Sequence, residues 1–178
     1  MERGLAVRIS LSLEGCARMT QDRKPGTASP HSISTMALHE ALKKGADEAV
    51  LMDKDGFISE GSGENIFMLK GNKIFTPTTN HCLNGITRQS VITIASDEGF
   101  EVIEKNLTYE DLANSDEAFF TGTAVEITPI TSLDMKSIGS GKRGNVTEKL
   151  QTIYSDAISG KSDKYSSWLT YANPLARD

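Results

Sequence analysis

Two glutamates and two glycines lie close together in the segment ISEGSGENIF, residues 58–67. Glycine lets the backbone adopt a positive φ and lets a ligand approach closely, so a glutamate in such a turn can be held partly buried. Glu60 and Glu64 are therefore candidate binding carboxylates. The alternative is a hairpin loop with two solvated carboxylates, which is the more frequent use of such a segment.

A turn that contains a glycine leads into an expected helix at LNGITR, residues 83–88. The first N–H groups of a helix have no partner within the helix, and with a nearby hydroxyl such as that of Thr87 they can bind a phosphate. The segment is a candidate anion site, with a plain helix start as the alternative.

A third polar segment interrupts the strand-like run FFTGTAVE, residues 119–126. The strand is expected to break at Thr121-Gly122-Thr123 and then to resume. Such a bulge can present backbone N–H groups and two hydroxyls to an anion, although an ordinary bulge is the commoner explanation.

Short strands, most of them joined as hairpins, and a few helices must position these segments. The expected strands cover residues 5–13, 48–53, 57–59, 64–70, 73–77, 101–107, 117–122 and 126–134. The expected helices cover residues 33–44, 85–98 and 146–157, with a short helix from Thr108. This order lacks the βαβ rhythm of a parallel sheet, so we predict one mixed α/β domain with a largely antiparallel sheet.

The composition opposes two classes of function. A net charge of −5 argues against nucleic-acid binding, and no apolar run approaches the roughly 18 residues of a membrane span. Cys16 and Cys82 lack the CxxC spacing of a metal or redox site. We therefore expect free thiols in a reducing cytoplasm, with no metal, nucleic-acid or membrane partner.

The chain resembles the class IV (fold type IV) pyridoxal-phosphate aminotransferases, and among them most the branched-chain amino-acid aminotransferases. The resemblance runs from about Glu40 to Trp168 through segments in the family order: EALKKGADEAVLMD, FISEGSGENIF, LNGITRQSV, DEAFFTGTAVEITPI and GNVTEKLQTIYSDAISGKSDKYSSWL. It implies the C-terminal pseudo-barrel domain of that fold, with pyridoxal 5′-phosphate (PLP) as the cofactor.

The resemblance also implies roles for the residues that match the family motifs. Glu60 would bind the pyridine nitrogen of the cofactor, and Leu83 would pack on the face of its ring. Gly85, Ile86 and Thr87 would bind the cofactor phosphate at the helix N-terminus.

The remaining matched residues would complete the site. Gly122 and Thr123 would complete the phosphate cup, and the loop with Thr123 and Ala124 would lie against the substrate α-carboxylate. Glu64 and Arg88 match positions that would support this loop and the helix start.

The catalytic lysine of the family, which would hold the cofactor as a Schiff base, falls on Gly26 when the helix over residues 33–44 is placed in register. Pro30 and His31 then stand at a family Asn-Tyr pair. Lys24 lies two residues too early, and a local shift of residues 14–31 would bring it into place. Lys24 is thus the candidate catalytic lysine, with an inactive chain as the alternative.

We expect an irregular segment over residues 1–31, truncated or altered relative to the family, and a PLP-binding domain over residues 32–178. The family's N-terminal domain, which supplies an arginine to the phosphate, has no counterpart before Met1. The implied reaction moves an amino group between L-leucine, isoleucine or valine and 2-oxoglutarate, with a homo-oligomer expected for the complete protein. A D-amino-acid aminotransferase, an aminodeoxychorismate lyase and a non-catalytic fragment are the alternatives.

Overall fold

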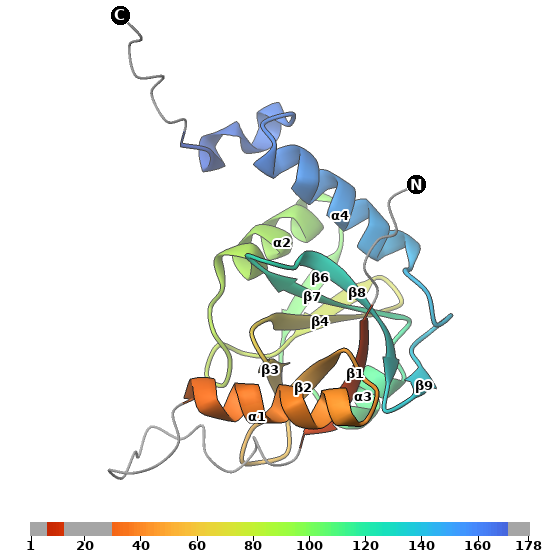
Figure 1. Cartoon of the computed structure of the whole chain (residues 1–178). Coiled ribbons are helices and arrows are strands. Elements are labelled where there is room, and N and C mark those ends of the chain that lie inside the picture. Colours follow the sequence, from red (N-terminus) through yellow and green to blue (C-terminus); the bar gives the residue numbers. More distant parts are fainter. Residues whose placement is uncertain (1–6, 13–29, 171–178) are drawn as a thin grey trace, which may run out of the picture.

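The computed structural model describes residues 7–12 and 30–170, and all statements of structure concern these residues. Their strands form one curled sheet in the order β3-β2-β1-β8-β7-β4-β5-β6, and β9 pairs with β8 (Figure 1). The strands are β1 (Val7–Ser12), β2 (Glu48–Met52), β3 (Ile58–Gly61), β4 (Asn65–Lys70), β5 (Lys73–Thr76), β6 (Glu101–Glu104), β7 (Glu117–Gly122), β8 (Glu126–Leu133) and β9 (Lys136–Ser137). The helices are α1 (Pro30–Lys43), α2 (Ile86–Asp97), α3 (Tyr109–Ala113), α4 (Asn145–Ile158) and the 3-10 helix η1 (Asp163–Trp168).

The expected mixed α/β fold with a largely antiparallel sheet is confirmed. The pairs β1–β2, β1–β8 and β5–β6 are parallel, and the other strand pairs are antiparallel. β1, from the segment before α1, lies between β2 and β8 and is therefore an interior strand of the sheet.

Alternating side chains on β4 and β7 divide the interior into two cores, because successive residues of a strand point to opposite faces. Ile66, Met68 and Phe120 pack inside the curl of the sheet. Phe67 and Phe119 point to the outer face, where their rings stack with centroids 5.2 Å apart.

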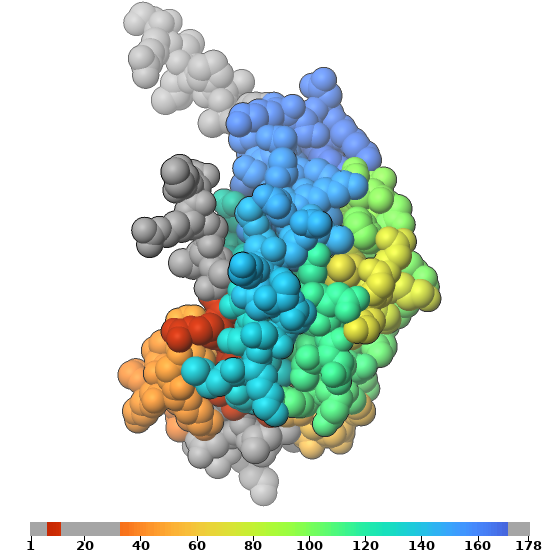
Figure 2. All heavy atoms as spheres, turned by 90° about the vertical axis from the view of Figure 1, so that its right-hand side faces the viewer, coloured from red at the N-terminus to blue at the C-terminus, as the bar shows by residue number. Residues whose placement is uncertain are grey.

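The helices cover the outer face in two places. α2 and α4 close the core around Phe67 and Phe119, whereas α1 packs Ala37 and Ala41 against β2. Figure 1 shows α2 and α4 together at one end of the sheet and α1 at the other. In Figure 2 the blue α4 forms a ridge well separated from the orange α1.

One expected feature differs in the structure. The Thr-Gly-Thr segment is not a bulge within one strand. The chain reverses there, and β7 and β8 form a hairpin in which Gly122 pairs with Glu126.

The 3-10 helix η1 is held by the buried Tyr165. The ring of Trp168 lies tilted against that of Tyr165, with centroids 4.5 Å apart, and Trp168 is 40% exposed.

A carboxylate on β7 fixes the start of α4. Glu117 accepts hydrogen bonds from the N–H groups of Val146 and Thr147, at 3.1 and 2.8 Å, and from the Thr147 hydroxyl at 2.7 Å. A Cβ on Gly144 would lie 2.0 Å from Glu117, so glycine is needed at this N-cap for space. A negative charge at a helix N-terminus also interacts favourably with the helix dipole.

Glu117→Ala should lower the free energy of unfolding by about 2 to 3 kcal/mol, because it leaves two N–H groups and a hydroxyl without their charged acceptor. Urea denaturation followed by circular dichroism measures this loss. Glu98→Ala, which removes a surface ion pair between α2 and Lys149 of α4, is the matched control and should cost less than about 1 kcal/mol. Equal losses for the two variants would contradict the anchoring role of Glu117.

Candidate active site

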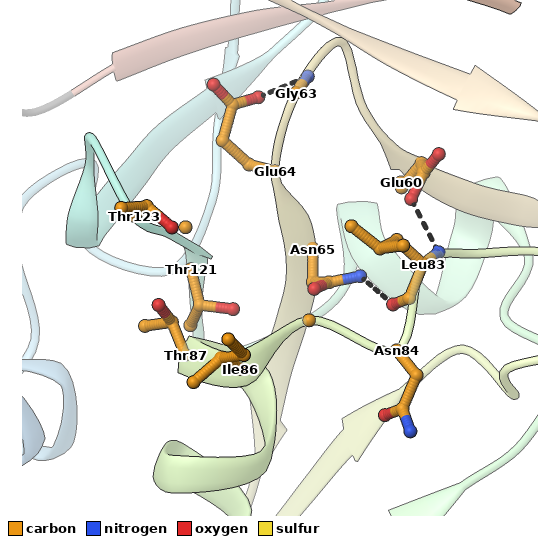
Figure 3. A pocket seen from close by; sticks show the side chains of 12 residues that line it. Glu60, Gly63, Glu64, Asn65, Leu83, Asn84, Ile86, Thr87, Thr121 and Thr123 are labelled. Atoms are coloured by element: carbon orange, nitrogen blue, oxygen red, sulfur yellow. Dashed lines mark hydrogen bonds between the residues drawn. The ribbon is translucent and has the colours of Figure 1, made fainter.

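The polar segments singled out in the sequence meet at one pocket with a volume of about 390 Å³. This volume is within the usual range for small-molecule sites. The lining comes from β3, the turn between β3 and β4, the start of β4, the segment that leads into α2, and the end of β7: Glu60, Gly63, Glu64, Asn65, Leu83, Asn84, Gly85, Ile86, Thr87, Thr121, Gly122 and Thr123. Figure 3 shows Glu60 and Leu83 on one side and the three threonines on the other.

Glu60 lies on β3 and is held by the main chain of the segment before α2. The N–H of Leu83 donates to Glu60 Oε2 at 2.9 Å. Burial raises the pKa of the Glu60 carboxyl, and the hydrogen bond from Leu83 opposes that rise. A half-buried carboxylate with spare acceptor capacity can therefore receive a proton-bearing group from the pocket.

Asn65 holds the main chain of the same residue, Leu83, through its carbonyl, a role that the sequence analysis missed. Its side-chain amide donates to the carbonyl of Leu83 at 2.7 Å. A Cβ on Gly85 would lie 2.3 Å from Asn65 Oδ1, so glycine allows the close approach of the two segments. The only local signal was an asparagine directly after Glu64, and nothing in the sequence showed its partner.

The first turn of α2 faces the pocket without a side-chain cap. Gly85 is the N-cap and offers no side-chain acceptor, so the first N–H groups of the helix remain available. The side chains of Leu83 and Ile86 are 71% and 86% exposed at the pocket. The Thr87 hydroxyl lies 3.5 Å from the Tyr154 hydroxyl of α4.

The β7–β8 turn closes the pocket beside α2. Gly122 and Thr123 line the pocket as expected, and Ala124 follows them in the turn without lining it. A Cβ on Gly122 would lie 3.2 Å from Val125 and 3.6 Å from Glu64, so the β7–β8 turn packs closely on the turn between β3 and β4. The β7–β8 hairpin, rather than the expected bulge, thus brings the Thr123 hydroxyl to the pocket.

Glu64 lies in the β3–β4 turn, where it accepts a hydrogen bond from the N–H of Gly63 at 3.0 Å. Burial, and next the charge of Glu48, raise the pKa of the Glu64 carboxyl. A Cβ on Gly61 would lie 2.6 Å from Glu64 Oε2. The pocket therefore holds two carboxylates, and none of the described residues that line it is lysine or arginine.

Arg88 supports the helix start from beneath rather than from the pocket. Its side chain is fully buried, and Nη2 donates to the carbonyl of Pro77 at 2.9 Å and to Glu104 at 2.7 Å. These contacts tie α2 to β6 and to the segment after β5.

Cys82 precedes Leu83 and is a free thiol. Its Sγ lies 3.5 Å from the carbonyl of Thr78, and burial raises the pKa of the thiol to about 11.

Lys24 and Gly26, the two candidates for the position of the catalytic lysine, lie outside the described residues, so their prediction is untested. Pro30 begins α1, and the side chain of His31 is likewise not described. Lys43 lies in the last turn of α1 and is exposed, as expected for a surface lysine. In the described part of the chain no cluster of His, Cys, Asp and Glu could hold a metal ion.

Asn65→Leu should release the segment before α2, because leucine has a similar volume but cannot donate to the Leu83 carbonyl. We expect faster hydrogen exchange of the amides of residues 83–88 and a free energy of unfolding lower by about 1 kcal/mol. Asn80→Ala removes an exposed amide from the same loop before α2 and should leave the exchange unchanged. Unchanged exchange in Asn65→Leu would show that Asn65 does not hold this segment.

Glu64→Gln should stabilise the chain at neutral pH. The raised pKa of Glu64 means that burial favours the protonated form, so its contribution to stability is present below the ordinary glutamate pKa and is lost as pH rises through the folded-state pKa. The gain should stay below about 1.4 kcal/mol, the equivalent of one pKa unit, because solvent still reaches the group. Unfolding at pH 4 and pH 8 measures it, and a gain that is larger at pH 4 would contradict the assignment.

Several known proteins are similar to this chain in sequence and in fold. A family model described as amino-transferase class IV matches residues 28–133, more than half of the chain. The branched-chain-amino-acid aminotransferase of Pseudomonas aeruginosa is 44% identical over 170 residues, which cover 96% of this chain and 55% of that protein. The enzyme of the same name from Escherichia coli is 41% identical over 135 residues, which cover 75% of this chain and 44% of that protein.

The fold agrees with this relationship. The crystal structure of the branched-chain amino acid aminotransferase from Thermobaculum terrenum in its PLP-form matches with a TM-score of 0.86 at 31% identity, over 94% of this chain and 56% of that chain. The chain spans about half the length of the relatives that it matches. The family match covers the segments that line the pocket, and the chain belongs to amino-transferase class IV.

Proposed function

We propose that this chain is the cofactor-holding part of a branched-chain amino-acid aminotransferase and binds pyridoxal 5′-phosphate in the pocket between β3, β7 and α2. One observation carries the proposal. The half-buried Glu60 and the uncapped N-terminus of α2 line a single pocket, and the N–H of Leu83, in the segment between them, donates to Glu60. The names of the relatives support the substrate class.

The residues present fit this cofactor at both of its ends. Glu60 offers carboxylate oxygen to a protonated ring nitrogen, and the free N–H groups of α2 with the hydroxyls of Thr87 and Thr123 offer donors to a phosphate. The exposed side chain of Leu83 supplies an apolar surface to a ring placed between the two ends. Glu64 supports the turn between β3 and β4, and Arg88 supports the helix start, rather than the cofactor.

When bound, the cofactor supplies an electron sink for the electrons released when the substrate loses its α-proton. Glu60 retains the proton on the ring nitrogen through a charge-assisted hydrogen bond. The N–H of Leu83 favours the charged form of Glu60, which this role requires. Asn65 keeps that N–H in place by holding the carbonyl of the same residue.

The β7–β8 turn is placed to contact the substrate. We assign the α-carboxylate of an L-amino acid with a branched aliphatic side chain to Thr123 and Ala124, and 2-oxoglutarate as the amino-group acceptor. A phosphate in a pocket that also holds two glutamates would be stabilised by a cation, and none of the described pocket residues supplies one. We assign this cation to a part of the complete protein outside the described residues.

We further propose that residues 32–178 form the cofactor-binding unit, with β1 as an added interior strand, and that the complete protein is a homo-oligomer of the reducing cytoplasm. The free thiol of Cys82 is consistent with that compartment. In the described residues no helix combines the length and the apolar character of a membrane span.

The test is titration of the 178-residue chain with PLP, followed by absorbance and by a transaminase assay with L-leucine and 2-oxoglutarate. We expect saturable binding. Glu60→Gln should lower transamination at least about a hundredfold while weakening binding far less, because it removes the charge that holds the ring proton. Glu101→Gln, an exposed change on β6, is the control and should match the wild type.

Absence of saturable binding would refute the proposal for this chain. If PLP binds, borohydride reduction and peptide mapping distinguish a catalytic chain from a non-catalytic one. A pyridoxyl adduct on Lys24 would identify the catalytic lysine, whereas reversible binding without an adduct would favour a non-catalytic fragment.

A further inference from the structure

Thr121 on β7 differs from the other buried threonines of the described chain. Four of them have a partner within hydrogen-bond distance: Thr76, Thr87, Thr128 and Thr147. The Thr121 side chain is fully buried, and its hydroxyl has no hydrogen-bond partner among the described residues. Burying an unpaired hydroxyl costs free energy, so this position calls for an explanation.

The position of Thr121 points to a ligand. Thr121 is the direct cross-strand partner of Asn65, so both side chains lie on the same face of the sheet, and both line the pocket. Thr87 and Thr123 line the same side of the pocket, next to the first turn of α2 (Figure 3). The unpaired hydroxyl therefore lies beside free helix N–H groups, a setting that favours an anion.

The hydrogen-bonding groups around Thr121 indicate which kind of ligand would bind there. A hydroxyl can donate one hydrogen bond, and the neighbouring hydroxyls and N–H groups on this side of the pocket are donors as well. An oxyanion accepts from all of them at once. The branched side chain of threonine has few χ1 rotamers, so its hydroxyl is oriented before the ligand arrives.

We propose that Thr121 is a further ligand of the cofactor, whose hydroxyl donates a hydrogen bond to the phosphate held at the N-terminus of α2. This inference rests on the proposed function, because it takes PLP as the ligand. It adds a third threonine hydroxyl, from the floor of the pocket, to those of Thr87 and Thr123.

Thr121→Val tests the proposal, because valine keeps the shape of the side chain and removes only the hydroxyl. Without ligand, the variant should unfold at the same temperature as the wild type or higher, since it removes an unpaired buried polar group. Its affinity for PLP should fall roughly tenfold, which corresponds to about 1.4 kcal/mol. Thr121→Ser should retain most of the affinity.

Thr76→Val is the matched control. Thr76 is equally buried, lies outside the pocket, and donates to the carbonyl of Ile66 at 2.8 Å. This variant should unfold at a lower temperature and bind PLP like the wild type. Pyridoxal, which lacks the phosphate, should bind equally well to the wild type and to Thr121→Val.

Each result has one meaning. Equal PLP affinity in Thr121→Val and wild type would overturn the role of Thr121 and leave the proposed function standing. An equal loss of affinity for PLP and pyridoxal, or a clear loss of stability in the absence of ligand, would show a structural role instead. Failure of the wild type to bind PLP at all would overturn the proposed function and this inference with it.

Discussion

The main-chain contacts of Leu83 are the interactions on which the pocket depends. Its N–H donates to Glu60 of β3, and its carbonyl accepts a hydrogen bond from Asn65 of β4. These two side chains, on either side of the β3–β4 turn, thus hold the segment before α2, whose first N–H groups have no side-chain cap.

Space, rather than backbone torsion, explains two of the glycines next to the pocket. Gly61 and Gly85 have ordinary φ values, but an added Cβ would collide with Glu64 and with Asn65. A side chain at either position would occupy the space of a neighbouring polar group, so only glycine lets the two segments pack this closely. The two hydrophobic cores, one on each face of β4 and β7, keep these strands in position.

Local patterns were sufficient for most elements. The helix start at Thr108 is confirmed as a capping box with Asp111, and Gly45 and Gly99 adopt the positive φ expected after helices. Two features depend on distant partners and were therefore not visible in the sequence: the Asn65–Leu83 contact and the parallel pairing of β1 with β8. The reversal at Gly122 is local, but the Thr-Gly-Thr pattern is also typical of a bulge and did not distinguish the two. The polar segments of the sequence predicted most of the residues that line the pocket. The hydrogen bonds among these residues became known only from the structure.

Cys82 adjoins the segment that carries Leu83, and the state of its sulfur has a practical consequence. With a pKa of about 11, only about one thiol in ten thousand is ionised at neutral pH. Since the thiolate is the form that reacts with peroxide, disulfides and alkylating reagents, this sulfur is chemically quiet. Oxidants and thiol reagents should therefore modify Cys82, which directly precedes the pocket residue Leu83, only slowly.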